Sequence, residues 1–269
     1  MILSAAVTRV LPCDGSRIAG AIDGDPLVAA TSIRYDMRWM ASELRRYLDE
    51  TRRPVYSAAL VLPFFLVYHA GTFFLQTTYI NGADALITQI LAMLSVRSAF
   101  ASALVLLLCF AAWQIRRGSG WKVRLPKLGF MFVESLLFAL LLYFVLGWTG
   151  VHLSKPPGSS PGVAERLILY CGAGIYEELV FRGFLLGALI LLLTRVAGLR
   201  KVPAAALGAV LAALLFSAFH YLGPASDSFT LRAFIQRAAG GLYFSCLFVT
   251  RGFGITAASH ALYDMIVGL

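Results

Sequence analysis

The feature that most constrains this chain is a succession of long apolar runs, each close in length to a membrane-spanning helix. A helix needs roughly 20 consecutive apolar residues to cross a bilayer. Seven runs approach or exceed that length, namely 55–79, 99–115, 128–151, 163–197, 202–221, 231–249 and 253–269. An eighth segment, 81–96, is shorter and more mixed. Since 59% of the residues are hydrophobic and only 14% are charged, a soluble globular domain is excluded. The pattern predicts an all-α, polytopic membrane bundle of seven transmembrane helices, or eight if 81–96 also spans.

The net charge of +9 would suggest nucleic acid as the partner of a soluble protein. Here the basic residues gather in residues 1–54 and in the loops 116–127 and 195–201. With the N-terminus in the cytoplasm and seven spans, these regions all face the cytoplasm, and the intervening loops hold only Arg97 and Lys155. This is the charge bias of the positive-inside rule. We therefore expect a multi-pass protein of the cell's inner (plasma) membrane, with the lipid bilayer and no nucleic acid as its partner.

The chain divides by composition into two parts. Residues 1–54 form a polar extension that is rich in arginine, and residues 55–269 form the membrane-embedded domain. Within the extension, apolar and basic residues alternate from 33 to 53. That alternation is typical of an amphipathic helix lying on the inner membrane face, and a solvated basic tail is an equal alternative.

Two adjacent carboxylates and a guanidinium, Glu177, Glu178 and Arg182, lie within the apolar run 163–197. Each charge at membrane depth costs roughly 2.5–3.5 kcal/mol on insertion scales. On an α-helix Glu178 and Arg182 share a face and can pair. Glu177 is rotated by about 100° from Glu178 and has no obvious partner within the helix. The three charges either clamp neighbouring helices together or form a functional site.

Two later apolar runs also carry polar groups. His220 ends the run 202–221, and His260 and Asp264 lie four residues apart in the last run. Polar groups on three separate helices are explained most economically by one shared cavity. A glutamate and a histidine, here Glu177 and His220, suit the activation of water, and His260 with Asp264 could stabilise an oxyanion.

A metal site is the alternative chemistry for the same residues. Glu177, His220, His260 and Asp264 are all of the residue types that bind zinc. The HExxH pattern of common zinc peptidases is absent, and so is a GxSxG nucleophile elbow or a cysteine beside a histidine. The residues alone leave a water-activating glutamate site and a zinc site open.

Three motifs together resemble a known family. Glu177-Glu178-xxx-Arg182, Phe216-xxx-His220 and His260-xxx-Asp264 follow one another on late spans. In this order they resemble the CPBP family, which comprises the type II CAAX prenyl endopeptidases and their bacterial, abortive-infection-like relatives. The resemblance covers about 163–269.

The resemblance implies an intramembrane endopeptidase, of glutamic or metallo type, that cleaves a peptide bond near the membrane surface. It implies that Glu177 and His220 activate the water, that His260 and residue 264 bind the oxyanion, and that Glu178 and Arg182 hold the site in shape. Family members commonly have Asn where this chain has Asp264. Because an ionised Asp cannot donate a hydrogen bond, this departure weakens the oxyanion role and favours the metal alternative.

The expected cofactor is therefore none or a divalent metal such as zinc. The expected substrate is a peptide or protein, either membrane-anchored or prenylated. The alternative function is a non-catalytic membrane immunity or scaffold protein with the same fold.

Overall fold

The computed structural model describes residues 26–75, 80–98, 100–147, 162–222 and 228–269, with side chains from residue 38 onwards. The chain divides into two compact units, residues 1–47 and 48–269. The described part of the first unit is helical and belongs to α1 (Pro26–Thr51), whose last residues lie in the second unit. The sequence-based division at 54/55 stays a prediction.

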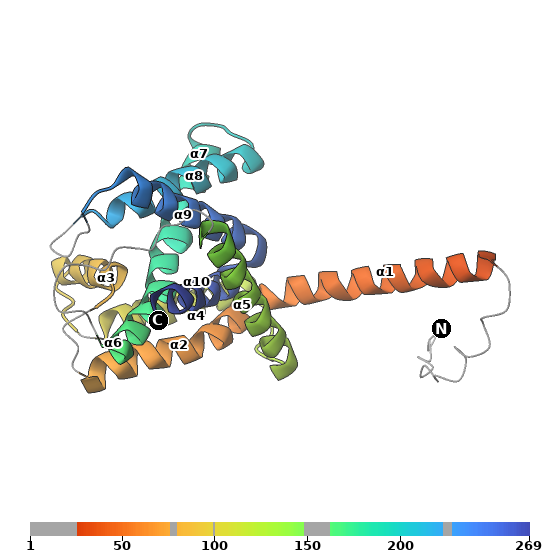
Figure 1. Ribbon diagram of the computed structural model, residues 1–269, viewed down its shortest axis with the longest axis horizontal. Helices are drawn as coiled ribbons and strands as arrows, with labels where there is room; N and C mark the ends of the chain where they lie inside the picture. The colour runs from red at the N-terminus through yellow and green to blue at the C-terminus, as the bar shows by residue number, and fades with distance from the viewer. Residues whose placement is uncertain (1–25, 76–79, 99, 148–161, 223–227) are drawn as a thin grey trace, which may run out of the picture. The chain divides into compact units, whose positions relative to one another are not determined.

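The described residues form helices and loops and contain no strand (Figure 1). After α1, the second unit contains α2 (Pro54–Leu75), α3 (Gly82–Met93), α4 (Ala101–Arg117), α5 (Leu125–Gly147), α6 (Val163–Gly172), the π-helix η2 (Ala173–Leu186), α7 (Gly187–Arg195), α8 (Lys201–Phe219), α9 (Leu231–Arg251) and α10 (Phe253–Gly268). Each apolar run of the sequence thus corresponds to a helix or, for 163–197, to three helices in succession.

Among the helices in the described ranges, three are long and apolar enough to cross a membrane, namely α2, α5 and α8. The 12 residues of α3 extend about 18 Å at 1.5 Å per residue, which is shorter than a hydrocarbon core of about 30 Å. Length and composition therefore support a helical membrane protein, whereas the number of spans remains a prediction.

The segment that carries Glu177, Glu178 and Arg182 is a π-helix, so its predicted α-helical geometry was wrong. The 14 residues of η2 run without a break from α6 into α7 (Figure 1). In a π-helix each N–H bonds five residues back, and such helices are rare and frequent at functional sites. The change of register alters the direction in which neighbouring side chains leave the helix axis.

Helix α10 packs against η2, α2, α5, α6 and α9. Its contact with η2 is very close: a Cβ on Gly174 would lie 2.5 Å from the carbonyl oxygen of Ala257 and 2.7 Å from the Cβ of Ala261. Small residues allow helix backbones to approach one another in this way. The absence of a side chain at Gly174 therefore lets the glutamates of η2 reach the histidine of α10.

The turn between α9 and α10 is a single residue, Gly252, whose φ of 82° lies in a region that favours glycine. Beside it, Arg251 Nη2 donates to Glu134 Oε2 over 2.8 Å and to Thr51 Oγ1 over 3.1 Å, and Arg251 Nε also donates to Glu134. These bonds join α9 to α5 and to the end of α1, so Glu134 is a structural ion-pair partner.

Candidate active site

Glu178, Arg182 and His260 form a buried ionic cluster between η2 and α10. Oε1 of Glu178 accepts from Arg182 Nη1 over 2.9 Å and from His260 Nδ1 over 2.7 Å. Glu178 is 0% exposed, Arg182 1% and His260 5%, so all three are shielded from solvent. The pairing of Glu178 with Arg182, expected from their spacing, is present despite the π-helical register.

The Arg182 guanidinium also contacts two further helices. Its Nη2 donates to the carbonyl oxygen of Gly241 on α9 over 3.1 Å. Its Cζ lies 4.5 Å from the ring centroid of Phe216 and 5.7 Å from that of Phe244. Aromatic faces stabilise a buried cation. Arg182 therefore connects η2 to α8 and α9 and gives the negative cluster its fixed positive charge.

Glu177 has a different set of partners from its neighbour. Its Oε1 accepts from the side-chain amide of Asn81 over 2.8 Å, and its Oε2 lies 3.9 Å from Nε2 of His260. Asn81 immediately precedes α3 and is far from Glu177 in sequence. Glu177 thus lacks a partner on its own helix, as expected, but it is held by a residue from a segment of uncertain role.

His260 is held on two sides. Its Nδ1 donates to Glu178, because the carboxylate can only accept, and its ring stacks on Phe244 at 4.5 Å with an interplanar angle of 19°. Its Nε2 faces two carboxylates, with Asp264 Oδ2 at 3.6 Å and Glu177 Oε2 at 3.9 Å. When His260 is protonated, Nε2–H becomes a donor pointed into this acidic environment.

His220 is the C-cap of α8 and is oriented by this helix. Its Nδ1 lies 2.9 Å from the carbonyl oxygen of Phe216, and a carbonyl oxygen only accepts. Nδ1 therefore carries the hydrogen, which leaves Nε2 of the neutral ring as an acceptor. The ring packs edge-on against Phe216, with centroids 4.9 Å apart.

A cavity of about 200 Å³ joins these groups. It is lined by Glu177, His220, His260 and Asp264, together with Leu146, Tyr170, Phe216, Gln236, Arg237, Gly240, Phe244 and Tyr263. All four predicted catalytic residues thus share one cavity. Glu178 and Arg182 do not line this cavity, and their role as supporting residues stays a prediction.

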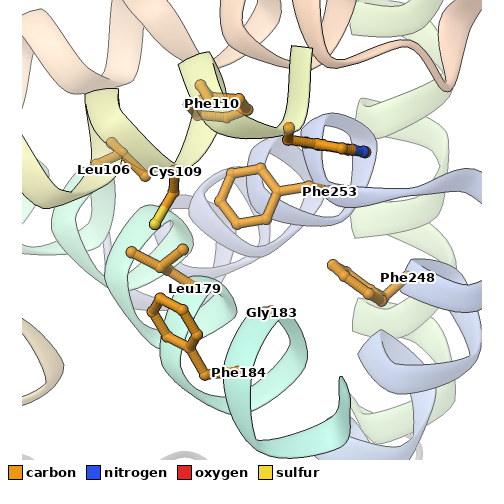
Figure 2. Close-up of a pocket in the computed structure, with 9 residues that line it drawn as sticks. Leu106, Cys109, Phe110, Leu179, Gly183, Phe184, Phe248 and Phe253 are labelled. Atoms are coloured by element: carbon orange, nitrogen blue, oxygen red, sulfur yellow. The ribbon is translucent and has the colours of Figure 1, made fainter. Parts of the chain in front are cut away.

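A second, larger cavity of about 370 Å³ is also bordered by η2 (Figure 2). Its lining is almost wholly apolar and consists of Leu106, Cys109, Phe110, Trp113, Leu179, Gly183, Phe184, Phe248 and Phe253. Figure 2 shows Cys109 and Leu179 pointing toward each other, with Gly183 on the neighbouring turn of η2. This cavity holds none of the ionisable residues of the first and suits an apolar group.

The predicted zinc alternative finds no support in this geometry. In the part of the chain that the structure describes, no three His, Cys, Asp or Glu side chains are placed to hold a metal ion. The hydrogen bonds at Nδ1 of His220 and Nδ1 of His260 leave Nε2 of each ring free, as they do in many metal-bound histidines. The described residues nevertheless contain no preformed set of metal ligands.

Sequence reasoning missed several residues of the site. Asn81 lies in a segment whose role was left open, although the polar pair Asn81 and Asp84 in an apolar context was a usable signal. Tyr170, Tyr263 and Phe244 reach the cavity only through the packing of α6, α9 and α10. No spacing pattern in the sequence marks such aromatic residues as different from the core.

Comparison with known proteins adds a family. Residues 159–266 match the family described as Type II CAAX prenyl endopeptidase Rce1-like. The matched segment contains Glu177, Glu178, Arg182, His220, His260 and Asp264, which confirms the resemblance drawn from the motifs. Neither curated proteins nor solved structures gave a match. Residues 159–266 of this chain are therefore similar to the Rce1-like type II CAAX prenyl endopeptidases.

Proposed function

We propose that this protein is an intramembrane endopeptidase whose water nucleophile is activated by Glu177 and His220. The observation that carries the proposal is the common cavity, in which a carboxylate and two imidazoles from three helices face one space of about 200 Å³. The match to a peptidase family supports the reaction class. Neither a nucleophilic serine nor a cysteine is required.

In the proposed reaction, a water lies between Glu177 Oε2 and His220 Nε2 and attacks the carbonyl carbon of the scissile peptide. Glu177 takes a proton from the water as the new C–O bond forms, and the carbonyl oxygen becomes an oxyanion. Collapse of the tetrahedral intermediate breaks the C–N bond, and the proton passes to the departing amine. General base catalysis of this kind contributes typically 10²- to 10⁴-fold.

The oxyanion donor in this scheme is Nε2–H of protonated His260. The carboxyl groups of Glu178 and Asp264 lie next to the two ring nitrogens of His260 and hold the ring in place. Asp264 then acts through His260 and needs no proton of its own. This assignment accommodates an Asp where the family commonly has Asn.

The proposed setting is a multi-pass protein of the plasma membrane with seven spans and a cytoplasmic N-terminus. The apolar helices α2, α5 and α8 support a membrane location, and the basic segments of the sequence support this orientation. In this setting the cavity acts on a peptide bond near the membrane surface, and the apolar helices around it strengthen electrostatic interactions inside it.

The proposed substrate is a peptide carrying an apolar anchor, such as a prenylated cysteine near its C-terminus. The family description supports this class, and the apolar cavity bordered by η2 offers space for such a group. A prenyl chain would be held there by burial of apolar surface, at roughly 25 cal/mol per Å².

The test is cleavage of a farnesylated peptide by the full chain purified into lipid vesicles, with products identified by mass spectrometry. Wild type is expected to release a C-terminal fragment, and His220→Ala is expected to lower kcat by at least about 100-fold because the water loses its second partner. Since the side chain of His220 hydrogen-bonds to a carbonyl of its own helix, the variant should unfold at nearly the wild-type temperature.

Two outcomes would contradict the proposal. Failure of wild type to cleave either the farnesylated peptide or its unlipidated counterpart would favour the immunity or scaffold alternative. Cleavage by His220→Ala at the wild-type rate would remove His220 from the mechanism.

A further inference from the structure

Asn81 is the residue that fixes the position of Glu177, and its own orientation is fixed by α3. The side-chain Oδ1 of Asn81 accepts from the backbone N–H groups of Ala83 over 2.9 Å and Asp84 over 3.4 Å, as an N-cap does. Because the oxygen is committed to the helix end, the Nδ2 of the same amide points away from it. Nδ2 donates to Glu177 Oε1 over 2.8 Å.

A second set of bonds holds the backbone of Asn81. Its N–H donates to the hydroxyl of Tyr68 on α2 over 3.3 Å, and that hydroxyl donates to Asp84 Oδ2 over 2.6 Å. Tyr68 is 0% exposed, Asp84 7% and Asn81 8%. The amide that meets Glu177 is therefore anchored from both its side chain and its main chain in a water-poor environment.

We propose that Asn81 is a positioning residue for catalysis, which holds Oε1 of Glu177 so that Oε2 faces His260 and the attacking water. The inference rests on the proposed function, since it assigns a role relative to Glu177 as the base. Asn81 lies outside the Rce1-like segment 159–266. The N-terminal half of the chain thus supplies a part of the site that the matched segment lacks.

The side chain of Asn81 has two separable roles: its oxygen caps α3, and its nitrogen donates a hydrogen bond to Glu177. Asp and Ser are N-cap residues as good as Asn, so Asn81→Asp and Asn81→Ser keep the first role. Asp presents only oxygens to the Glu177 carboxylate, and Ser is too short to span the gap. Asn81→Ala removes both roles and serves as the reference for loss of the cap.

The experiment measures kcat and KM of wild type and the three variants on the farnesylated peptide, together with their unfolding temperatures. Loss of a hydrogen bond to a charged group corresponds to a decrease in kcat on the order of 10- to 100-fold. We expect this decrease in Asn81→Ser, with KM nearly unchanged and with an unfolding temperature above that of Asn81→Ala, which also loses the cap. Asn81→Asp should lower kcat as well, but it should lose stability despite its cap because its carboxylate repels that of Glu177.

If Asn81 had a purely structural role, every variant that keeps the N-cap of α3 would keep its activity. Wild-type kcat in both Asn81→Asp and Asn81→Ser, with a decrease only in Asn81→Ala, would overturn the inference while the proposed function stands. Failure of the wild-type chain to cleave would overturn the proposed function, and the inference with it.

Discussion

Adjacent carboxylates in η2 differ because their partners differ. Glu178 accepts hydrogen bonds from a guanidinium and an imidazole and is fully buried, so its carboxylate is engaged by Arg182 and His260. Glu177 meets a neutral amide and borders the cavity, so one of its oxygens stays available to a reactant. Two adjacent glutamates therefore have different proposed roles: Glu178 supports the site, and Glu177 acts on water.

At this scale we expect Arg182→Met to destabilise the protein by roughly 3–5 kcal/mol, because it leaves Glu178 as a buried charge with one partner fewer. Denaturant unfolding in detergent micelles measures the effect. The matched control is Arg116→Met, which removes an exposed guanidinium from the end of α4 and should change stability by less than about 0.5 kcal/mol. An equal, small effect of both substitutions would show that the cluster does not stabilise the fold.

The sequence predicts part of this residue-level arrangement. The spacing of Glu178 and Arg182 and the occurrence of His220 and His260 on later helices were sufficient to group them. The bond from Asn81 to Glu177 could not be predicted, because it depends on how α3 packs against η2. A long-range contact of this kind leaves no periodic signal in a single chain.

At the scale of the helices, the positions predicted from the sequence agree well with the structure, but the hydrogen-bond register of one helix differs. The apolar runs locate α2, α4, α5, α8, α9 and α10 to within a few residues, since the hydrophobic pattern alone sets where a helix can lie. The π-register of η2 was missed because residue type hardly distinguishes i→i+4 from i→i+5 bonding. The register is set by tertiary contacts, above all the close approach to α10.

That approach makes Gly174 the most sensitive glycine of η2. Gly174→Ala places a Cβ 2.5 Å from the Ala257 carbonyl oxygen and 2.8 Å from the Ala261 backbone nitrogen, which backbone atoms cannot relieve without moving α10. We expect a loss of about 1–3 kcal/mol of stability, typical of overpacking, and a loss of cleavage because His260 moves with its helix.

The matched control for Gly174→Ala is Gly187→Ala. It lies at the start of α7, and a Cβ there meets no atom within 4 Å. Alanine favours a helix by about 1 kcal/mol over glycine, so this control should leave the protein as stable as wild type or slightly more so. Equal stability of both variants would contradict the close packing of η2 against α10.

At the scale of the whole molecule, the Rce1-like segment 159–266 supplies the acids, the guanidinium and both imidazoles. The remaining helices of the second unit contribute in other ways. Asn81, the N-cap of α3, donates a hydrogen bond to Glu177, and Tyr68 of α2 accepts from the backbone N–H of Asn81. Helix α4 supplies one wall of the apolar cavity. Composition was enough to predict a helical membrane protein. The contribution of the helices before residue 159 to the site could not be predicted from the sequence, since it depends on contacts between distant segments.

The measurement that tests the account most directly is the single-turnover cleavage rate of Glu177→Gln on the farnesylated peptide in vesicles. Glutamine keeps the size of the side chain and can still accept from Asn81, but it cannot take a proton from water.

The control is Glu165→Gln, which alters a glutamate in the first turn of α6, outside the lining of either cavity. The account predicts that Glu177→Gln folds like wild type and loses at least about 100-fold in rate, while Glu165→Gln cleaves normally. Cleavage by Glu177→Gln at the wild-type rate would contradict the central claim that this carboxylate activates the water.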